Sequence, residues 1–149
     1  MHLFAVIIFL GNIITELLWM RNSIKTKDLK IISFTIKSII KGDKYFTLPG
    51  VVIITVSGIL ASTFGYLAYM QPGWLTWSVT LFIISGLAYT FKVAPLQKKI
   101  YTLTLSKETV TPFDWAGLNK LYASWNNWGL VALLTSVAAF VMMTIKISH

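Results

Sequence analysis

The residues best suited to chemistry lie on one stripe of an otherwise apolar segment near the start of the chain. Asn12 and Glu16 are four positions apart, so on a helix their side chains share a face. His2 lies fourteen positions before Glu16, which places it about 40° away around the same helix. A carboxyl group in such surroundings can bind a proton or a cation, contact a ligand, or form a structural ion pair. We therefore expect the polar stripe to face other helices.

The ion pair is the more ordinary interpretation of Glu16, because this residue lies close to the end of its apolar segment. Lys92 falls at a matching depth in another apolar segment and is the possible ion-pair partner. Arg21 and Lys44 are alternatives. The functional interpretation instead makes Asn12 and Glu16 a proton or cation site.

The two histidines, His2 and His149, are the other candidate ligands. Imidazole can bind haem or a metal ion, so His2 is the candidate cofactor-binding residue, as an axial ligand of haem. The chain has no cysteine, which excludes disulfides, thiolate catalysis and cysteine metal sites. A zinc site needs three or four ligands, and no such set is present. Phosphate-binding loops and nucleophile elbows are also missing, so the sequence predicts no catalytic residue and no metal site.

Four apolar stretches must position these residues. They cover residues 3–20, 51–70, 74–94 and 128–147. About 20 apolar residues in a helix cross the ~30 Å hydrocarbon core of a bilayer. Only 12% of the residues are charged, against about 25% in ordinary soluble proteins. The sequence therefore predicts an all-α fold, an integral membrane four-helix bundle that forms a single transmembrane domain over residues 1–149.

The basic residues predict the orientation of this bundle. The net charge is +8, and most of the lysines fall between the first and second stretches or between the third and fourth. Cytoplasmic segments of membrane proteins carry such an excess of lysine and arginine. We therefore expect residues 21–44 and 95–120 to be cytoplasmic and both termini to lie outside. The membrane boundary explains the charge without a nucleic-acid partner.

The first cytoplasmic segment has a helical pattern of its own. Apolar residues recur with a period close to 3.6 at Leu29, Ile32, Ile36, Ile39 and Ile40. This pattern predicts an interfacial amphipathic helix, with Lys30, Lys37 and Lys41 facing anionic lipid headgroups. We expect Gly42 to end this helix and Asp43 to cap the second span, which would begin near Lys44.

Two short segments carry a resemblance to a known family. They are residues 43–52, with the sequence DKYFTLPGVV, and residues 95–99, with the sequence PLQKK. Together with His2 and the Leu10-Gly11-Asn12 segment, they resemble the bacterial integral membrane protein family "domain of unknown function 2269" over nearly the whole chain. That family is distantly similar to membrane proteins of the CopD type and of the protoporphyrinogen oxidase-like HemJ type. Those relatives imply haem or redox chemistry with a histidine early in the first span. His2 matches that position, but the chain has no second histidine within a span.

Three functions from different classes remain open on the sequence alone. The first is a non-enzymatic subunit or accessory factor that binds a membrane protein partner or forms a homo-oligomer. The second is a haem-binding membrane redox protein that uses His2. The third is a small proton-linked transporter that uses Asn12 and Glu16. A stoichiometric partner, a haem absorption band and a flux that depends on Glu16 would separate them.

Overall fold

Long helices account for all the regular structure that is described. The computed structural model describes residues 2–64, 73–105 and 112–145. The first long helix is α1, His2–Thr26, and the last is α7, Trp115–Ile145. Within the described ranges there is no strand, and four helices have the length and hydropathy to cross a membrane. The predicted all-α fold with four membrane-spanning helices is thus confirmed.

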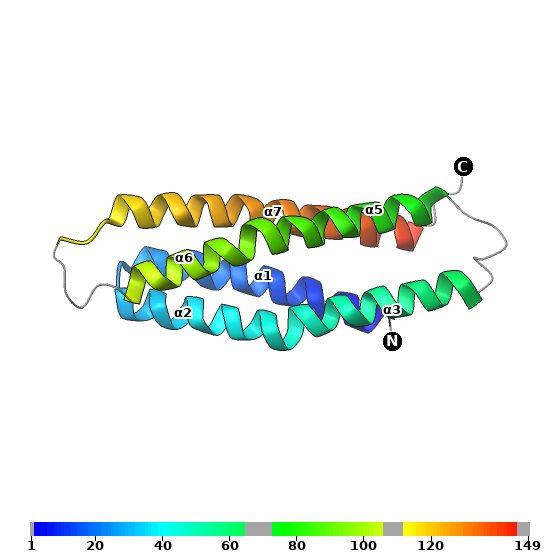
Figure 1. Cartoon of the computed structure of the whole chain (residues 1–149), viewed down its shortest axis with the longest axis horizontal. Helices are drawn as coiled ribbons and strands as arrows, with labels where there is room; N and C mark the ends of the chain where they lie inside the picture. Colours follow the sequence, from blue (N-terminus) through cyan, green and yellow to red (C-terminus); the bar gives the residue numbers. More distant parts are fainter. Residues whose placement is uncertain (1, 65–72, 106–111, 146–149) are drawn as a thin grey trace.

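The second and third long helices are each built from three consecutive pieces. The second consists of α2 (Leu29–Gly42), the π-helical turn η1 (Asp43–Thr47) and α3 (Leu48–Phe64). The third consists of α5 (Gly73–Ala88), the π-helical turn η2 (Tyr89–Val93) and α6 (Ala94–Leu105). The four long helices run alternately up and down along one axis (Figure 1). In the ribbon view, α2 and α6 form one half of the bundle, and α3 and α5 form the other.

A proline follows each π-helical turn at the same spacing. Pro49 and Pro95 each lie two residues after the end of a turn. Proline has no backbone N–H and its ring clashes with the carbonyl four residues earlier, so a regular helix cannot continue unchanged. The widened turn absorbs this conflict: the N–H of Leu48 bonds to Asp43 O, and the N–H of Ala94 bonds to Tyr89 O. Both long helices therefore continue past their prolines.

A tight connection joins the first two long helices. Lys27 has a φ of 51°, in the left-handed region, and this reverses the chain direction. The side chain of Asp28 then caps α2, because its Oδ1 accepts a hydrogen bond of 2.9 Å from the N–H of Lys30.

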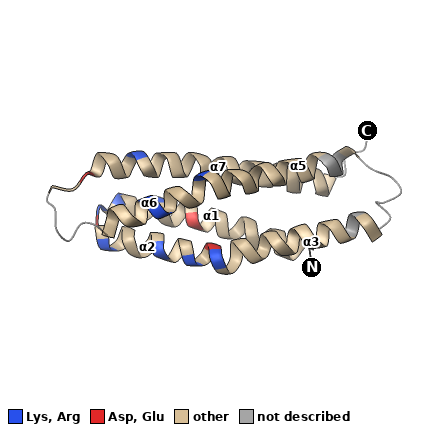
Figure 2. Cartoon of the chain, viewed as in Figure 1, with Lys and Arg blue, Asp and Glu red and all other residues tan. Residues whose placement is uncertain are grey.

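The bundle is longer than a bilayer is thick. The apolar helix Leu29–Leu60 alone has 32 residues, which corresponds to about 48 Å against a hydrocarbon core of ~30 Å. In the described residues, lysine and arginine lie in the half formed by α2 and α6 and near the middle of the bundle (Figure 2). Among the described residues, the half formed by α3 and α5 is free of these charges. That half is the part whose surface suits lipid, and the basic half extends beyond it.

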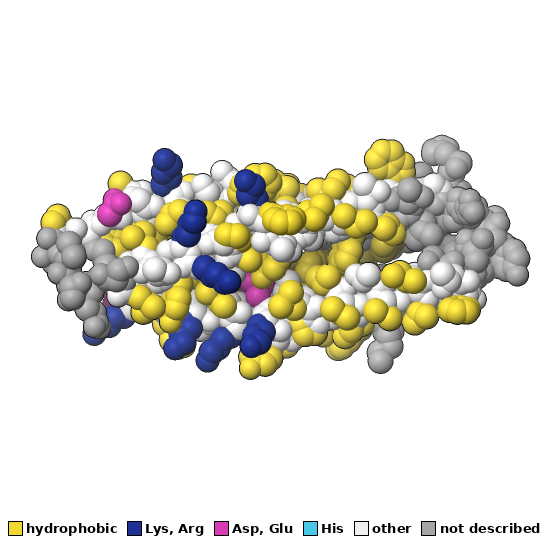
Figure 3. Space-filling view, in the orientation of Figure 1, with side chains coloured by type: hydrophobic (Ala, Val, Ile, Leu, Met, Phe, Trp, Pro, Cys, Tyr) yellow, Lys and Arg dark blue, Asp and Glu magenta, His cyan; other side chains and the backbone are white. Residues whose placement is uncertain are grey.

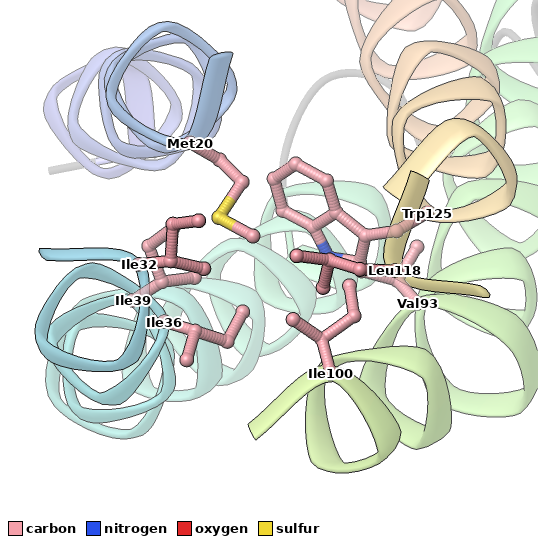
Figure 4. Close-up of a cluster of buried hydrophobic side chains, with 8 residues drawn as sticks. All are labelled: Met20, Ile32, Ile36, Ile39, Val93, Ile100, Leu118 and Trp125. Atoms are coloured by element: carbon pink, nitrogen blue, oxygen red, sulfur yellow. The ribbon is translucent and has the colours of Figure 1, made fainter. Parts of the chain in front are cut away.

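Each half has its own hydrophobic core. In the basic half, Trp125 and Met20 pack with residues of α2, α6 and α7, shown in Figure 4. The buried members are Met20, Ile32, Ile36, Ile39, Val93, Ile100, Leu118 and Trp125. In the uncharged half, a second core consists of Ala5, Val6, Phe9, Ile13 and Ile54. Two separate cores leave a boundary in the middle of the bundle, where polar residues are buried.

The interfacial helix predicted for the first cytoplasmic segment is not seen. A helix does form there, from Leu29 to Gly42, and it has the predicted periodicity. However, its apolar residues Ile32 and Ile36 are fully buried against other helices instead of facing lipid. Gly42 keeps helical angles (φ −55°, ψ −47°), so α2 continues directly into η1. The reason is that α1, α6 and α7 extend as far as α2 does, and their side chains cover the apolar face of α2.

Most of the two segments predicted to be cytoplasmic consists of helices that extend the spans. Residues 21–44 and 95–120 include the end of α1, all of α2, most of α6 and the start of α7. Trp125 is 1% exposed and lies in the core of the basic half. The last six residues of the predicted 51–70 stretch lie outside the described residues, as does the end of the predicted 128–147 stretch.

Candidate functional site

Two carboxyl groups are buried side by side where the two halves of the bundle meet. Glu16 lies in α1 and is 7% exposed, and Asp43 lies at the start of η1 and is 3% exposed. The two side chains interact directly with each other. Figure 2 shows the acidic positions on α1 and at the junction of α2 with α3, close to the middle of the bundle. We call Asn12, Glu16, Asp43, Thr47, Tyr89 and Gln97 the carboxyl-pair site.

Asn12 connects Glu16 to the second long helix. Its Nδ2 donates one hydrogen bond to Glu16 Oε1 at 2.6 Å and another to Thr47 Oγ1 at 2.9 Å. Thr47 is 1% exposed and ends the π-helical turn that Asp43 begins. The shared face predicted for Asn12 and Glu16 therefore points into the bundle. The amide positions Glu16 against η1.

Asp43 is held by the third long helix but is incompletely paired. Its Oδ2 accepts a hydrogen bond of 2.7 Å from Gln97 Nε2, and Gln97 is 3% exposed. Tyr89, the first residue of η2, interacts with the same carboxyl group. Asp43 Oδ1 is buried and has no hydrogen-bond partner. An unpaired buried carboxyl oxygen is costly and therefore marks a place where a further ligand can bind.

In the part of the chain that the structure describes, no basic side chain pairs with Glu16 or Asp43, although Lys92 was the predicted partner. The Lys92 ammonium group lies 5.4 Å from the centroid of the Trp128 ring, a cation–π geometry. Lys44, one of the alternatives, is exposed.

The two π-helical turns shape the space around the carboxyl pair. Asp43 begins η1 and Tyr89 begins η2, so each turn contributes a polar side chain to the site. Turns of this kind often occur at functional sites in helices. Next to them, Gly42 brings backbone close to the pair, and a methyl group there would lie 3.4 Å from Glu16 Oε1. Because glycine has no side chain, α1 and the second long helix can pack closely at Gly42.

Apolar side chains close the site on both sides along the bundle. The core of the basic half covers one side, and Phe9, Ile13 and Ile54 lie on the other. Beyond them is a small apolar cavity of about 20 Å³, lined by residues of all four long helices that include Phe9, Phe82 and Ser136. Such a volume holds about one water molecule. In the space-filling view, a hollow lies between the α5–α7 pair and the α1–α3 pair in the uncharged half of the bundle (Figure 3).

The other predicted ligands are not part of this geometry. His2 is the first residue of α1, and the placement of its side chain is not described. His149 lies outside the described residues. In the described ranges there is no group of three or more His, Cys, Asp or Glu residues that could hold a metal ion.

The sequence prediction missed most of the carboxyl-pair site, although a signal for it exists. Asp43 was expected to cap a helix, but it continues the buried stripe of the second long helix. That stripe runs through Ile32, Ile36, Ile39, Asp43, Thr47, Gly50 and Ile54, at steps of three and four residues. Extending the apolar period of α2 past Gly42 would have placed Asp43 in the interior. Gln97 likewise shares a buried stripe with Val93 and Ile100.

Four apolar helices and a buried polar centre define an integral membrane protein of the helix-bundle class. The chain belongs to the family described as predicted integral membrane protein (DUF2269), which it matches over residues 1–147. No curated protein and no solved structure matches the chain. The resemblance predicted from the sequence is therefore confirmed at the level of the family.

Proposed function

We propose that this protein is a small proton-linked membrane transporter, and that Glu16 and Asp43 together bind the transported or coupled proton. The observation that carries the proposal is the unpaired, buried Asp43 Oδ1 beside a second buried carboxyl group. Carboxyl groups inside membrane proteins line proton pathways in pumps and transporters.

Electrostatics supports one shared proton on the pair. Two carboxylates in contact repel each other strongly in a low-dielectric interior, so the two groups do not both ionise readily. No basic side chain in the described residues offsets their charge. One proton bound between the two groups lowers the charge of the pair from minus two to minus one. Asn12 and Gln97 then act as positioning residues, because each donates a hydrogen bond to one carboxyl group.

The site also has the location that a coupling site needs. It lies between two separate apolar cores, so a bound proton is shielded from both ends of the bundle. The two π-helical turns lie at this level, and local departures from α-helix allow a helix to bend. Bending at η1 and η2 would open the site to one end at a time, as alternating access requires.

The proposal is tested by measuring proton flux into liposomes that contain the purified full-length protein. A potassium gradient with valinomycin sets the membrane potential, and an enclosed dye reports internal pH. We expect flux above that of protein-free liposomes. Glu16→Gln and Asp43→Asn keep the shape of each side chain but remove its acid group, and each should reduce the flux to the protein-free rate.

The matched control is Asp114→Asn, which removes an exposed carboxylate. Asp114 accepts a hydrogen bond from the N–H of Gly117, and asparagine can keep that cap. This variant should transport like the unchanged protein. Wild-type flux equal to that of protein-free liposomes would contradict the transporter proposal, and full flux in Asp43→Asn would remove Asp43 from the mechanism.

Two other classes stay open and have their own tests. An accessory subunit should copurify with a membrane partner in stoichiometric amount, or form a homo-oligomer, from native membranes. A haem protein should show a Soret band that His2→Ala removes. Neither test depends on Glu16 or Asp43, so the flux measurements and these experiments separate the three functions.

We further propose that the basic half faces the cytoplasm of a bacterial cell and contacts anionic headgroups. At about 1.5 Å per residue, Lys41 lies about 4.5 Å and Lys30 about 21 Å from Lys44 along the helix axis, while the headgroup layer is only ~5–8 Å thick. Lys30, Lys37 and Lys41 were the predicted contacts, and this spacing favours Lys41 together with Lys44. Lys41→Gln with Lys44→Gln should weaken the stabilisation of the protein by anionic lipid. Lys30→Gln should not, and an equal effect of both changes would contradict the proposal.

A further inference from the structure

We propose that the carboxyl-pair site also binds one small monovalent alkali cation of the Na⁺ class, in competition with the proton. This inference rests on the proposed function, since it assumes that the pair exchanges its proton. The observations that carry it are the unpaired buried Oδ1 of Asp43 and the nearby carboxyl and hydroxyl oxygens of Glu16, Thr47 and Tyr89. Nothing in the family description assigns a ligand.

The donor set favours a hard cation. Glu16, Asp43, Thr47 and Tyr89 bring carboxyl and hydroxyl oxygens together from α1, η1 and η2. Asn12 and Gln97 face the carboxyl groups with their amide nitrogens and hold them in place. Hard cations prefer carboxylate, carbonyl and hydroxyl oxygens, whereas transition metals prefer imidazole and thiolate ligands. The described residues contain no group of three His, Cys, Asp or Glu residues that could hold a metal ion. Oxygen donors of this kind fit a hard cation.

Charge selects a monovalent ion over a divalent one. A singly protonated carboxyl pair carries one negative charge, and so does a fully ionised pair with one Na⁺ bound. Exchange of a proton for Na⁺ thus leaves the buried charge unchanged, and no new uncompensated charge enters the low-dielectric interior. Ca²⁺ takes six to eight oxygen ligands, and Mg²⁺ usually keeps several waters, which a site between two apolar cores does not favour.

Existing hydrogen bonds indicate how the cation would be held. Asp43 Oδ2 is occupied by Gln97, which leaves Oδ1 free toward the cation. Glu16 Oε1 accepts a hydrogen bond from the Asn12 amide. Thr47 Oγ1 accepts a hydrogen bond from the same amide and keeps a lone pair for a cation. Binding requires only that the shared proton leaves and that these side chains adjust.

The test measures proton release from the purified full-length protein in detergent, at low buffer strength, with a pH indicator. Adding saturating NaCl should release up to one proton per protein at a pH where the pair holds its shared proton. Adding the same concentration of choline chloride should release none beyond the small effect of ionic strength. Glu16→Gln and Asp43→Asn should abolish the release, and Asp114→Asn should retain it. Size-exclusion chromatography and thermal unfolding of each variant establish that it is folded.

An acid pulse on the same samples separates this inference from the proposed function. If the wild type takes up a proton that Asp43→Asn does not, but NaCl releases none, the cation site is overturned and the proton site stands. If neither the pulse nor NaCl distinguishes wild type from the two variants, both proposals are overturned. Asparagine at position 43 keeps the size of aspartate and can still accept the hydrogen bond from Gln97. A folded Asp43→Asn variant that still releases a proton with NaCl would therefore contradict the assignment of the cation site to Asp43.

Discussion

At the scale of single residues, the notable fact is that two carboxyl groups are buried together with amides, and that in the described residues no lysine or arginine pairs with either of them. Asn12 and Gln97 each donate to one carboxyl group, so the pair is oriented without being neutralised. A structural ion pair would stabilise an ionised carboxylate permanently. An amide N–H instead bonds to a carboxyl oxygen whether the group is protonated or ionised, so the pair can bind and release a proton without losing these hydrogen bonds.

Asn12 provides a direct test of this arrangement. Asn12→Ala removes the donor to Glu16 Oε1 and Thr47 Oγ1 and leaves both acceptors without it. We expect a loss of about 1–3 kcal/mol in the free energy of unfolding, the usual cost of an unsatisfied buried polar group. Reversible unfolding in mixed micelles measures the change. Asn22→Ala, at an exposed position of the same helix, is the control and should change stability little. Equal stability of the two variants would contradict the contacts of Asn12.

The sequence could predict part of the site, and the missing part has a physical explanation. The i, i+4 spacing placed Asn12 and Glu16 on one face, because that relation is local to one helix. Asp43 and Gln97 are far from Glu16 in the sequence, and their contact depends on the register between helices. The Gly42-Asp43 pair also looked like a helix end, whereas a π-helical turn carries the chain through it. Lys92 had the right depth but contacts Trp128.

At the scale of elements, α2 shows how tertiary packing decides between two uses of one amphipathic pattern. Its period fits either a helix on the membrane surface or a helix in a water-exposed bundle. Sequence alone does not choose, because both environments accept an apolar face. The length of α1, α6 and α7 decides the outcome, since these helices also continue past the apolar half and bury Ile32 and Ile36.

Truncation of α2 side chains distinguishes the two arrangements. Ile36→Ala should create a cavity in the core of the basic half and lower the free energy of unfolding by about 2–5 kcal/mol. Phe34→Ala, at a position 73% exposed, should have a much smaller effect although the side chain is larger. Unfolding in mixed micelles, monitored by circular dichroism, compares the two variants. A larger loss for Phe34→Ala would indicate a helix that lies on the lipid surface, and would contradict the bundle.

At the scale of the whole molecule, the bundle has an apolar half, a basic half and a polar centre between them. The apolar stretches predicted the number of spans and the fold class well, because the length of an apolar run reflects the thickness of the bilayer. The apolar stretches gave no information on the basic half, because α2 and α6 mix apolar and polar residues at helical spacing, as helices of soluble bundles do. The orientation across the membrane follows only from the positive charges and remains a prediction.

Cysteine labelling tests this orientation, and the absence of native cysteine makes the experiment simple. Lys37→Cys in α2 and Lys99→Cys in α6 place thiols at exposed positions of the basic half. We expect both to react with a membrane-impermeant maleimide in inverted vesicles and to be protected in intact cells. The reverse pattern would mean that the positive charges face outward. Labelling of only one of the two would contradict the placement of α2 and α6 in the same half of the bundle.

The central claim is that Glu16 and Asp43 hold one proton between them, and infrared spectroscopy of the protonated carboxyl band tests it most directly. The purified protein should show this band at neutral pH, where exposed carboxyl groups are ionised. Glu16→Gln and Asp43→Asn should each remove or shift the band, and Asp114→Asn should leave it unchanged. Absence of the band in the wild-type protein, or a band that neither substitution alters, would contradict the account.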